Sequence, residues 1–88
     1  MSNFQKKLIK EYEQKGYIVI KTIRLNKNGF PDLFLFKNGV TTFIESKELN
    51  DSLSELQKLR IDQLIKNGFD AKCIQDTKGI IYPYKNNK

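Results

Sequence analysis

The sequence GFPDLFLFKNGVTTFIESK, residues 29–47, sets the architecture of this chain. Two runs rich in aromatic and β-branched residues flank a polar segment at 37–39 that contains glycine, which predicts a β-hairpin. Asp32 begins the first strand, and Glu45 and Lys47 end the second. Because the start of one antiparallel strand lies beside the end of the next, the hairpin gathers two carboxylates and an ammonium group. Two neighbouring carboxylates repel each other unless a cation or proton separates them, so this pattern predicts a divalent-metal site.

Length and composition describe a small globular protein. Its 88 residues predict a single domain, 1–88, of marginal stability, for which association with a second copy would add buried surface. The apolar runs are too short to cross a membrane, and no signal-peptide pattern begins the sequence. The single cysteine, Cys73, has no internal disulfide partner, so we expect a cytoplasmic protein.

The absence of histidine and the positive net charge limit the classes of function that this chain can have. The sequence contains no histidine, which excludes imidazole zinc sites and Ser-His or Cys-His catalysis. Catalysis would have to use carboxylates, lysine, hydroxyls or metal-bound water. The net charge of +6 favours an anionic partner such as nucleic acid, although basic charge can also serve solubility alone.

Periodicity predicts the elements around the hairpin. Apolar residues at helical spacing indicate a helix over 4–15 that ends at Gly16. The run at 17–25 opens with consecutive apolar residues, which predicts a strand covered on both faces. A turn at 26–29 then leads into the hairpin.

The second half of the chain is expected to return to the sheet. A capping box with Ser52 as the cap and Glu55 reaching back predicts a helix that runs to about Asn67. Its core arc consists of Leu53, Leu56, Ile61 and Leu64. A strand at 69–75, a short edge strand at 80–83 and a polar tail at 84–88 complete the order α-β-β-β-α-β-β. This order predicts an α/β (α+β) fold with a mixed sheet flanked by helices.

The ionisable residues of the hairpin have a specific spacing. A Pro-Asp pair at 31–32 is followed by twelve residues and then by Glu45-x-Lys47. Carboxylate oxygens suit Mg²⁺ or Mn²⁺, and such a cation can polarise a phosphoryl oxygen and activate water while Lys47 orients that water. The alternative is a solvated surface pair at a strand end. The Pro-Asp pair on the preceding strand favours the metal site.

These motifs in order, with residues 53–57 and the later Gly68, resemble those of the PD-(D/E)xK nuclease superfamily. Over nearly its whole length the chain is most similar to stand-alone VRR-NUC (virus-type replication-repair nuclease) domains. The resemblance implies a restriction-endonuclease-like core and Mg²⁺- or Mn²⁺-dependent cleavage of DNA. It also implies homodimers that act on branched DNA such as four-way (Holliday) junctions, and a phage or bacterial host cytosol.

The resemblance assigns roles to particular residues. Asp32 and Glu45 would be metal ligands, Lys47 the catalytic lysine, and the backbone carbonyl of Ser46 a further ligand. Gln57 matches a glutamine that this subgroup carries on the helix after the motif.

Three polar residues outside the motif complete the candidate set. Where the superfamily often has a glutamate on the first helix, this chain has Gln5, whose neutral carbonyl oxygen would hold a second cation less well. Arg24 on the strand before the motif, and Arg60 one turn beyond Gln57, would either hold backbone phosphates or form ordinary surface salt bridges.

Three functions therefore compete. The first is a metal-dependent DNA endonuclease, and the second is a non-catalytic nucleic-acid-binding module that keeps the same fold. The third is a small interaction protein, such as an accessory or antitoxin-like partner. DNA against RNA, and a junction against a nick or flap, stay open at this point.

Overall fold

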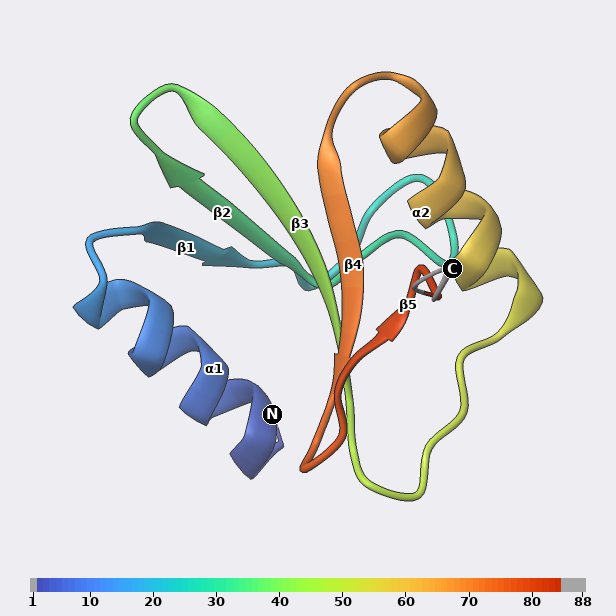
Figure 1. The fold of residues 1–88 in the computed structure, drawn as a ribbon, viewed down its shortest axis with the longest axis horizontal. Coiled ribbons are helices and arrows are strands. Elements are labelled where there is room, and N and C mark those ends of the chain that lie inside the picture. The colour runs from blue at the N-terminus through green and yellow to red at the C-terminus, as the bar shows by residue number, and fades with distance from the viewer. Residues whose placement is uncertain (1, 85–88) are drawn as a thin grey trace.

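The computed structural model describes residues 2–84 and contains one five-stranded sheet and two helices (Figure 1). The elements are α1 (Asn3–Gln14), β1 (Ile18–Lys21), β2 (Leu33–Lys37), β3 (Val40–Lys47), α2 (Glu55–Lys66), β4 (Asp70–Gln75) and β5 (Gly79–Tyr82). The expected order α-β-β-β-α-β-β is confirmed. Residues 85–88 of the expected polar tail lie outside the described residues. Neither helix is long and apolar enough, within residues 2–84, to span a bilayer.

The sheet is mixed, and its spatial order β1-β2-β3-β4-β5 follows the sequence. The β3–β4 pair is parallel, because α2 carries the chain back between them, and the other pairs are antiparallel. The predicted hairpin is confirmed, with Leu33 opposite Ile44. Its tight turn has positive φ angles at Asn38 (52°) and Gly39 (76°), which are typical of two-residue hairpin turns.

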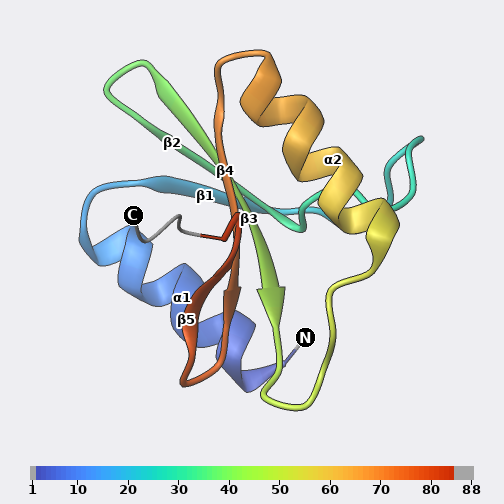
Figure 2. The ribbon, with the colours of Figure 1, turned by 45° about the vertical axis from the view of Figure 1, so that its right-hand side comes forward.

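The two helices cover opposite faces of the sheet (Figure 2). Leu8 of α1 packs in a buried cluster with Leu33, Leu35 and Ile44 of the hairpin. Ile61 of α2 packs in a second cluster with Ala71 and Cys73 of β4. Alternate residues of the central strands therefore enter different clusters, as the two-residue period of a β-strand requires.

The first strand differs from the prediction. We expected 17–25 to be a strand covered on both faces, but β1 ends at Lys21 and is an edge strand. Ile18 is 65% exposed and Ile20 is 48% exposed. Only one face of β1 packs on α1, and residues 22–29 leave the sheet as a loop. A run of apolar residues alone does not distinguish a central strand from an uncovered edge.

The start of α2 also differs from the prediction. Ser54, not Ser52, is the N-cap, and its hydroxyl accepts a hydrogen bond from the Gln57 backbone N–H at 3.1 Å. The Gln57 side chain accepts in return from the Ser54 N–H at 2.9 Å. Leu53 consequently precedes the helix, and Leu56 is 39% exposed, so the buried arc of α2 is narrower than expected.

Replacing Gly29 with alanine should destabilise the fold. Gly29 has φ +77°, and a Cβ there would lie 2.7 Å from Cγ of Leu56. We expect a loss of about 1–3 kcal/mol in the free energy of unfolding, measured by urea denaturation. Gly39→Ala is the matched control, because Gly39 has φ +76° with no atom within 4 Å of the added carbon. Equal losses in the two variants would show that the Leu56 contact does not matter.

Candidate active site

The hairpin brings the three ionisable residues of the motif to one end of the sheet. Glu45 is only 7% exposed although it carries a carboxylate. Lys47, two residues further along β3, places Nζ 3.8 Å from Oε2 of Glu45. Asp32 immediately precedes β2 and lies close enough to affect the ionisation of Glu45. The three side chains therefore share one electrostatic environment rather than pointing to separate regions of solvent.

Three donors hold the Asp32 carboxylate. The Ser46 N–H donates to Oδ1 at 3.0 Å, and the Ser46 hydroxyl donates to Oδ2 at 2.6 Å. The side-chain amide of Gln5 donates to Oδ2 as well, at 2.6 Å. Because the donors come from β3 and α1, this carboxylate has a fixed orientation.

Gln5 is a buried residue on α1, 8% exposed, and its amide nitrogen faces the site. The same nitrogen is 3.4 Å from the Ser46 hydroxyl oxygen. The carbonyl oxygen predicted as a weak metal ligand is therefore not the atom directed at Asp32, and rotation of the amide would be needed to present it. In this arrangement Gln5 acts as a donor that positions Asp32.

Burial is the main cause that raises the pKa of Glu45 to about 8, and the nearby charge of Asp32 raises it further. Lys47 and the backbone of Asp32 lower that pKa only in part. Gln57 donates its side-chain amide to Oε2 of Glu45 at 3.2 Å. A second positive charge at this position would relieve the electrostatic cost of ionising Glu45 next to Asp32.

The donor set fits one hard cation. Within residues 2–84, Oδ1 of Asp32 accepts a hydrogen bond from the Ser46 N–H and Oε2 of Glu45 accepts one from Gln57, so each carboxylate retains lone pairs for a cation. Within that part of the chain, no group of three or more His, Cys, Asp or Glu residues could hold a metal. Further ligands must therefore be neutral oxygens or water, as Mg²⁺ and Mn²⁺ accept.

The two arginines do not contact these carboxylates. Arg24 lies in the exposed loop after β1, not on a strand as expected. Arg60 donates Nε to the Asn28 carbonyl at 2.9 Å and Nη1 to the Gln63 side chain at 3.2 Å. Arg60 thus joins α2 to the loop before β2, which neither the phosphate nor the salt-bridge interpretation anticipated.

Sequence reasoning missed Gln75, which is 5% exposed at the end of β4. Its Nε2 lies 2.7–3.1 Å from three backbone carbonyls in the segment that follows Lys47, those of Glu48, Leu49 and Asp51. Gln75 thereby fixes the path from the site to α2. The available signal was a polar residue in register with the buried positions of an alternating strand.

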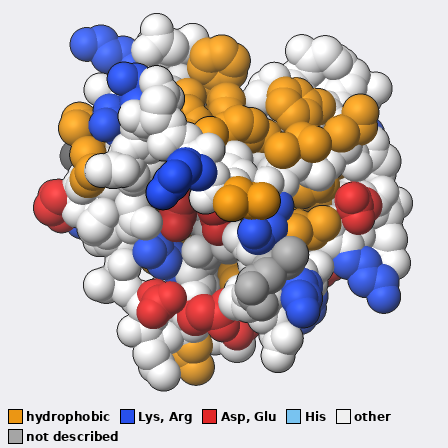
Figure 3. All heavy atoms as spheres, turned by 180° about the vertical axis from the view of Figure 1, so that it is seen from behind, with side chains coloured by type: hydrophobic (Ala, Val, Ile, Leu, Met, Phe, Trp, Pro, Cys, Tyr) orange, Lys and Arg blue, Asp and Glu red, His pale blue; other side chains and the backbone are white. Residues whose placement is uncertain are grey.

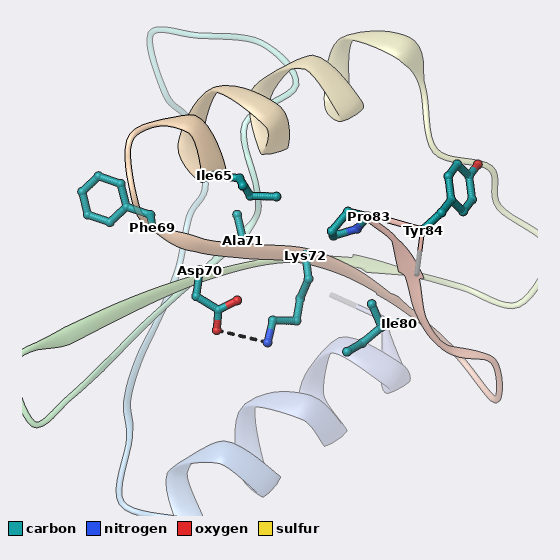
Figure 4. A pocket seen from close by; sticks show the side chains of 8 residues that line it. All are labelled: Ile65, Phe69, Asp70, Ala71, Lys72, Ile80, Pro83 and Tyr84. Carbon is teal, nitrogen blue, oxygen red and sulfur yellow. Dashed lines mark ion pairs between the residues drawn. The ribbon is translucent and has the colours of Figure 1, made fainter. Parts of the chain in front are cut away.

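A separate apolar pocket of about 380 Å³ lies beside β4 and β5 (Figure 4). Ile65, Phe69, Ile80 and Tyr84 are among its lining residues, and a Lys72–Asp70 ion pair of 3.1 Å flanks it. The pocket includes none of the residues predicted from the motif. It is therefore distinct from the carboxylate site.

The raised pKa of Glu45 predicts a pH dependence of stability in the absence of divalent cations. Between its ordinary value of 4.5 and about 8, the folded protein holds a proton that the unfolded chain releases. The free energy of unfolding should consequently fall as the pH rises through this window, and it should level off above about pH 8. Glu45→Gln, which cannot ionise, should lack this decline in thermal unfolding measured from pH 5 to 9.

Glu11→Gln is the control for that experiment, because Glu11 lies on the exposed face of α1. This variant should retain the decline of the wild-type protein. Parallel curves for wild type and Glu45→Gln would show that Glu45 ionises normally in the folded state.

Comparison with known proteins agrees with this geometry. The model of the VRR-NUC domain family matches residues 2–76. Comparison with curated proteins finds no significant match. A solved VRR-NUC domain superimposes with a TM-score of 0.70 at 26% identity, covering 80% of this chain and 77% of that one.

A second solved structure shares the fold at lower identity. It is Hjc, a Holliday junction resolvase from Archaeoglobus fulgidus, with a TM-score of 0.64 and 19% identity. The superposition covers 82% of this chain and 64% of the archaeal chain. The fold is thus a restriction-endonuclease-like core, shared with that resolvase. Because the family model spans 75 of its 88 residues, this chain belongs to the VRR-NUC domain family.

Proposed function

We propose that this protein is an Mg²⁺- or Mn²⁺-dependent endonuclease that hydrolyses phosphodiester bonds in DNA, with branched DNA such as four-way junctions as its substrate. The observation that carries the proposal is the convergence of Asp32, the almost fully buried Glu45 and Lys47 at one end of the hairpin. Membership in a nuclease family and a fold shared with a Holliday junction resolvase support it.

Asp32 and Glu45 would hold the cation, with the backbone carbonyl of Ser46 as a third ligand. Gln5 would hold Asp32 in place, and its amide oxygen could join the ligand set only after the amide rotates. The bound cation would polarise a phosphoryl oxygen and lower the pKa of water. Its positive charge would also counteract the burial and the repulsion from Asp32 that raise the pKa of Glu45.

Two side chains, those of Lys47 and Gln57, would assist the metal ligands. The Lys47 ammonium, 3.8 Å from Glu45, can orient the attacking water and offset the negative charge that develops on phosphorus. Gln57 donates to Glu45 while its other amide atom is held by the cap of α2. The start of α2 therefore fixes the direction of the Glu45 carboxylate.

The charge distribution suits a polyanion. The net charge is +6, and α1, which carries Gln5 into the site, presents the exposed side chains of Lys6, Lys7 and Lys10 on its outer surface. Arg24 is exposed in the loop that precedes the motif. Such cations would contact phosphates near the site and make binding depend strongly on salt.

Cleavage assays test the proposal directly. Wild-type protein should cut a four-way junction in Mg²⁺ or Mn²⁺, and Lys47→Ala should slow cleavage by about 10²–10³-fold, since it removes one charge-stabilising group. Asp32→Ala should remove measurable cleavage, because only one carboxylate would remain. Product yield on gels, with plasmid as a second substrate, gives the measurement.

Lys66→Ala is the control, because this lysine ends α2 and is exposed. It removes the same charge and should leave cleavage unchanged. If wild type and Asp32→Ala give equal yields, the chain is not the nuclease. Salt-sensitive DNA binding without cleavage, and without a Tm increase on adding Mn²⁺, would instead support a non-catalytic binding module.

We also propose that the protein acts as a homodimer through the sheet face that α2 leaves partly uncovered. Ile18 and Ile20 of β1 lie opposite Phe36 and Phe34 of β2, so the four side chains share this face. Phe34 also lies opposite Phe43 of β3, whose ring meets Phe69 edge-on at 5.5 Å. Figure 3 shows apolar side chains gathered on both sides of a hollow when the molecule is seen from behind.

The size of this face suits a second copy. Ile18, Ile20, Phe36 and Phe69 are 65%, 48%, 37% and 44% exposed. At about 150–250 Å² for a large apolar side chain, these four leave roughly 400 Å² uncovered. That is about half of the ~800 Å² that each partner contributes to a standard interface, as expected for its apolar centre.

A charge placed on this face should separate the subunits. We expect wild-type protein to sediment as a dimer and Ile20→Lys as a monomer, because a two-fold axis would bury the new charge twice. Val40→Lys is the control. Val40 is 61% exposed, but the alternation along β3 places its side chain on the other face of the sheet. A wild-type monomer at micromolar concentration would contradict the proposal.

A further inference from the structure

In the loop that joins β1 to β2, residues 22–29 project past α2 (Figure 2). Ile23 in this loop is 91% exposed, more than any other large apolar side chain in residues 2–84. Leu25 is 38% exposed in the same segment. Ile23 lies outside both buried clusters, so core packing does not explain why an apolar residue occupies this position.

Both ends of this loop are fixed. The backbone N–H and the hydroxyl of Thr22 donate to the Asp32 carbonyl at 2.9 and 3.2 Å. At the other end, Arg60 of α2 donates to the Asn28 carbonyl at 2.9 Å, and Gly29 packs closely under Leu56. The loop is thus anchored on the backbone of a predicted metal ligand, and its position relative to the site is set by the fold.

The chemistry of the loop combines cations with an apolar tip. Arg24 follows Ile23 directly, and Lys27 lies three residues further on, both exposed. The same segment lines a polar hollow of about 310 Å³. Cationic side chains bind phosphates, and apolar side chains such as isoleucine are inserted between base steps by proteins that bend DNA.

We propose that residues 22–29 form a wedge that places Ile23 against unstacked bases at a DNA branch point while Arg24 and Lys27 contact the flanking phosphates. The proposal rests on the DNA nuclease function above and deepens it by naming the element that selects the substrate. Inserting an apolar side chain into continuous duplex requires a base step to be unstacked. At a branch point this cost is already partly met, so Ile23 should favour branched over linear DNA.

The test measures binding without cleavage, in EDTA, to a four-way junction and to linear duplex of equal length. Ile23→Ala should weaken junction binding by about tenfold, the scale of one lost base contact, and change duplex binding less than twofold. With 2-aminopurine at the branch point, wild-type protein should raise the fluorescence, and Ile23→Ala should not.

Two variants serve as controls. Val40→Ala removes another exposed apolar side chain, in the β2–β3 hairpin, and should leave both affinities unchanged. Arg24→Ala should weaken binding to the junction and to the duplex by the same factor. It should also reduce the salt dependence of binding by the amount expected for about one phosphate contact. Thermal unfolding should be the same for Ile23→Ala and wild type, because the side chain is almost fully exposed.

Each other outcome overturns the wedge. Equal weakening on junction and duplex would make Ile23 a general contact, and no weakening would make it irrelevant to DNA. A rise in 2-aminopurine fluorescence with Ile23→Ala as large as that with wild type would exclude contact between Ile23 and the branch point. If wild type cleaves junctions but Ile23→Ala behaves identically, only the wedge fails, whereas wild-type protein that neither binds nor cleaves DNA removes the proposed function as well.

Discussion

The register between β2 and β3 is the constraint on which the site depends. With Leu33 opposite Ile44, Asp32 lies beside the end of β3, where residues 45–47 follow. A shift of one residue would turn Leu33 and Ile44 out of the buried cluster that α1 covers. The apolar packing of the hairpin therefore also fixes where its carboxylates meet, so stability and the geometry of the site have one cause.

Polar contacts then orient what the hairpin brings together. Gln5 and Ser46 hold Asp32, while Gln57 holds Glu45 from the cap of α2. These donors are neutral, and within residues 2–84 the one ion pair to these carboxylates is that of Lys47 with Glu45, at 3.8 Å. The pKa of Glu45 accordingly stays raised, to about 8. The two carboxylates are thus held in position, but their negative charge is not fully balanced. A divalent cation would supply the missing positive charge.

Local patterns predicted the parts of the fold that depend on neighbours in sequence. The hairpin followed from alternating residues around a turn, and the order of elements followed from periodicity. The coverage of β1 did not, because it depends on which helix reaches the sheet edge. The cap of α2 was ambiguous, since Ser52-x-x-Glu55 and Ser54-x-x-Gln57 both fit a capping box.

The same distinction applies to the site. Asp32, Glu45 and Lys47 were predictable because one hairpin carries all three. The contacts of Gln75 were not, since its carbonyl partners lie 24–27 residues away in the sequence. Arg60 was assigned to phosphate or salt-bridge contacts, and only the fold shows that it bonds the Asn28 carbonyl 32 residues away. Helix α2 therefore acts at two points: Gln57 orients Glu45, and Arg60 anchors the loop that ends at the hairpin. A single rigid helix thus sets both the direction of one carboxylate and the position of the exposed loop next to the other.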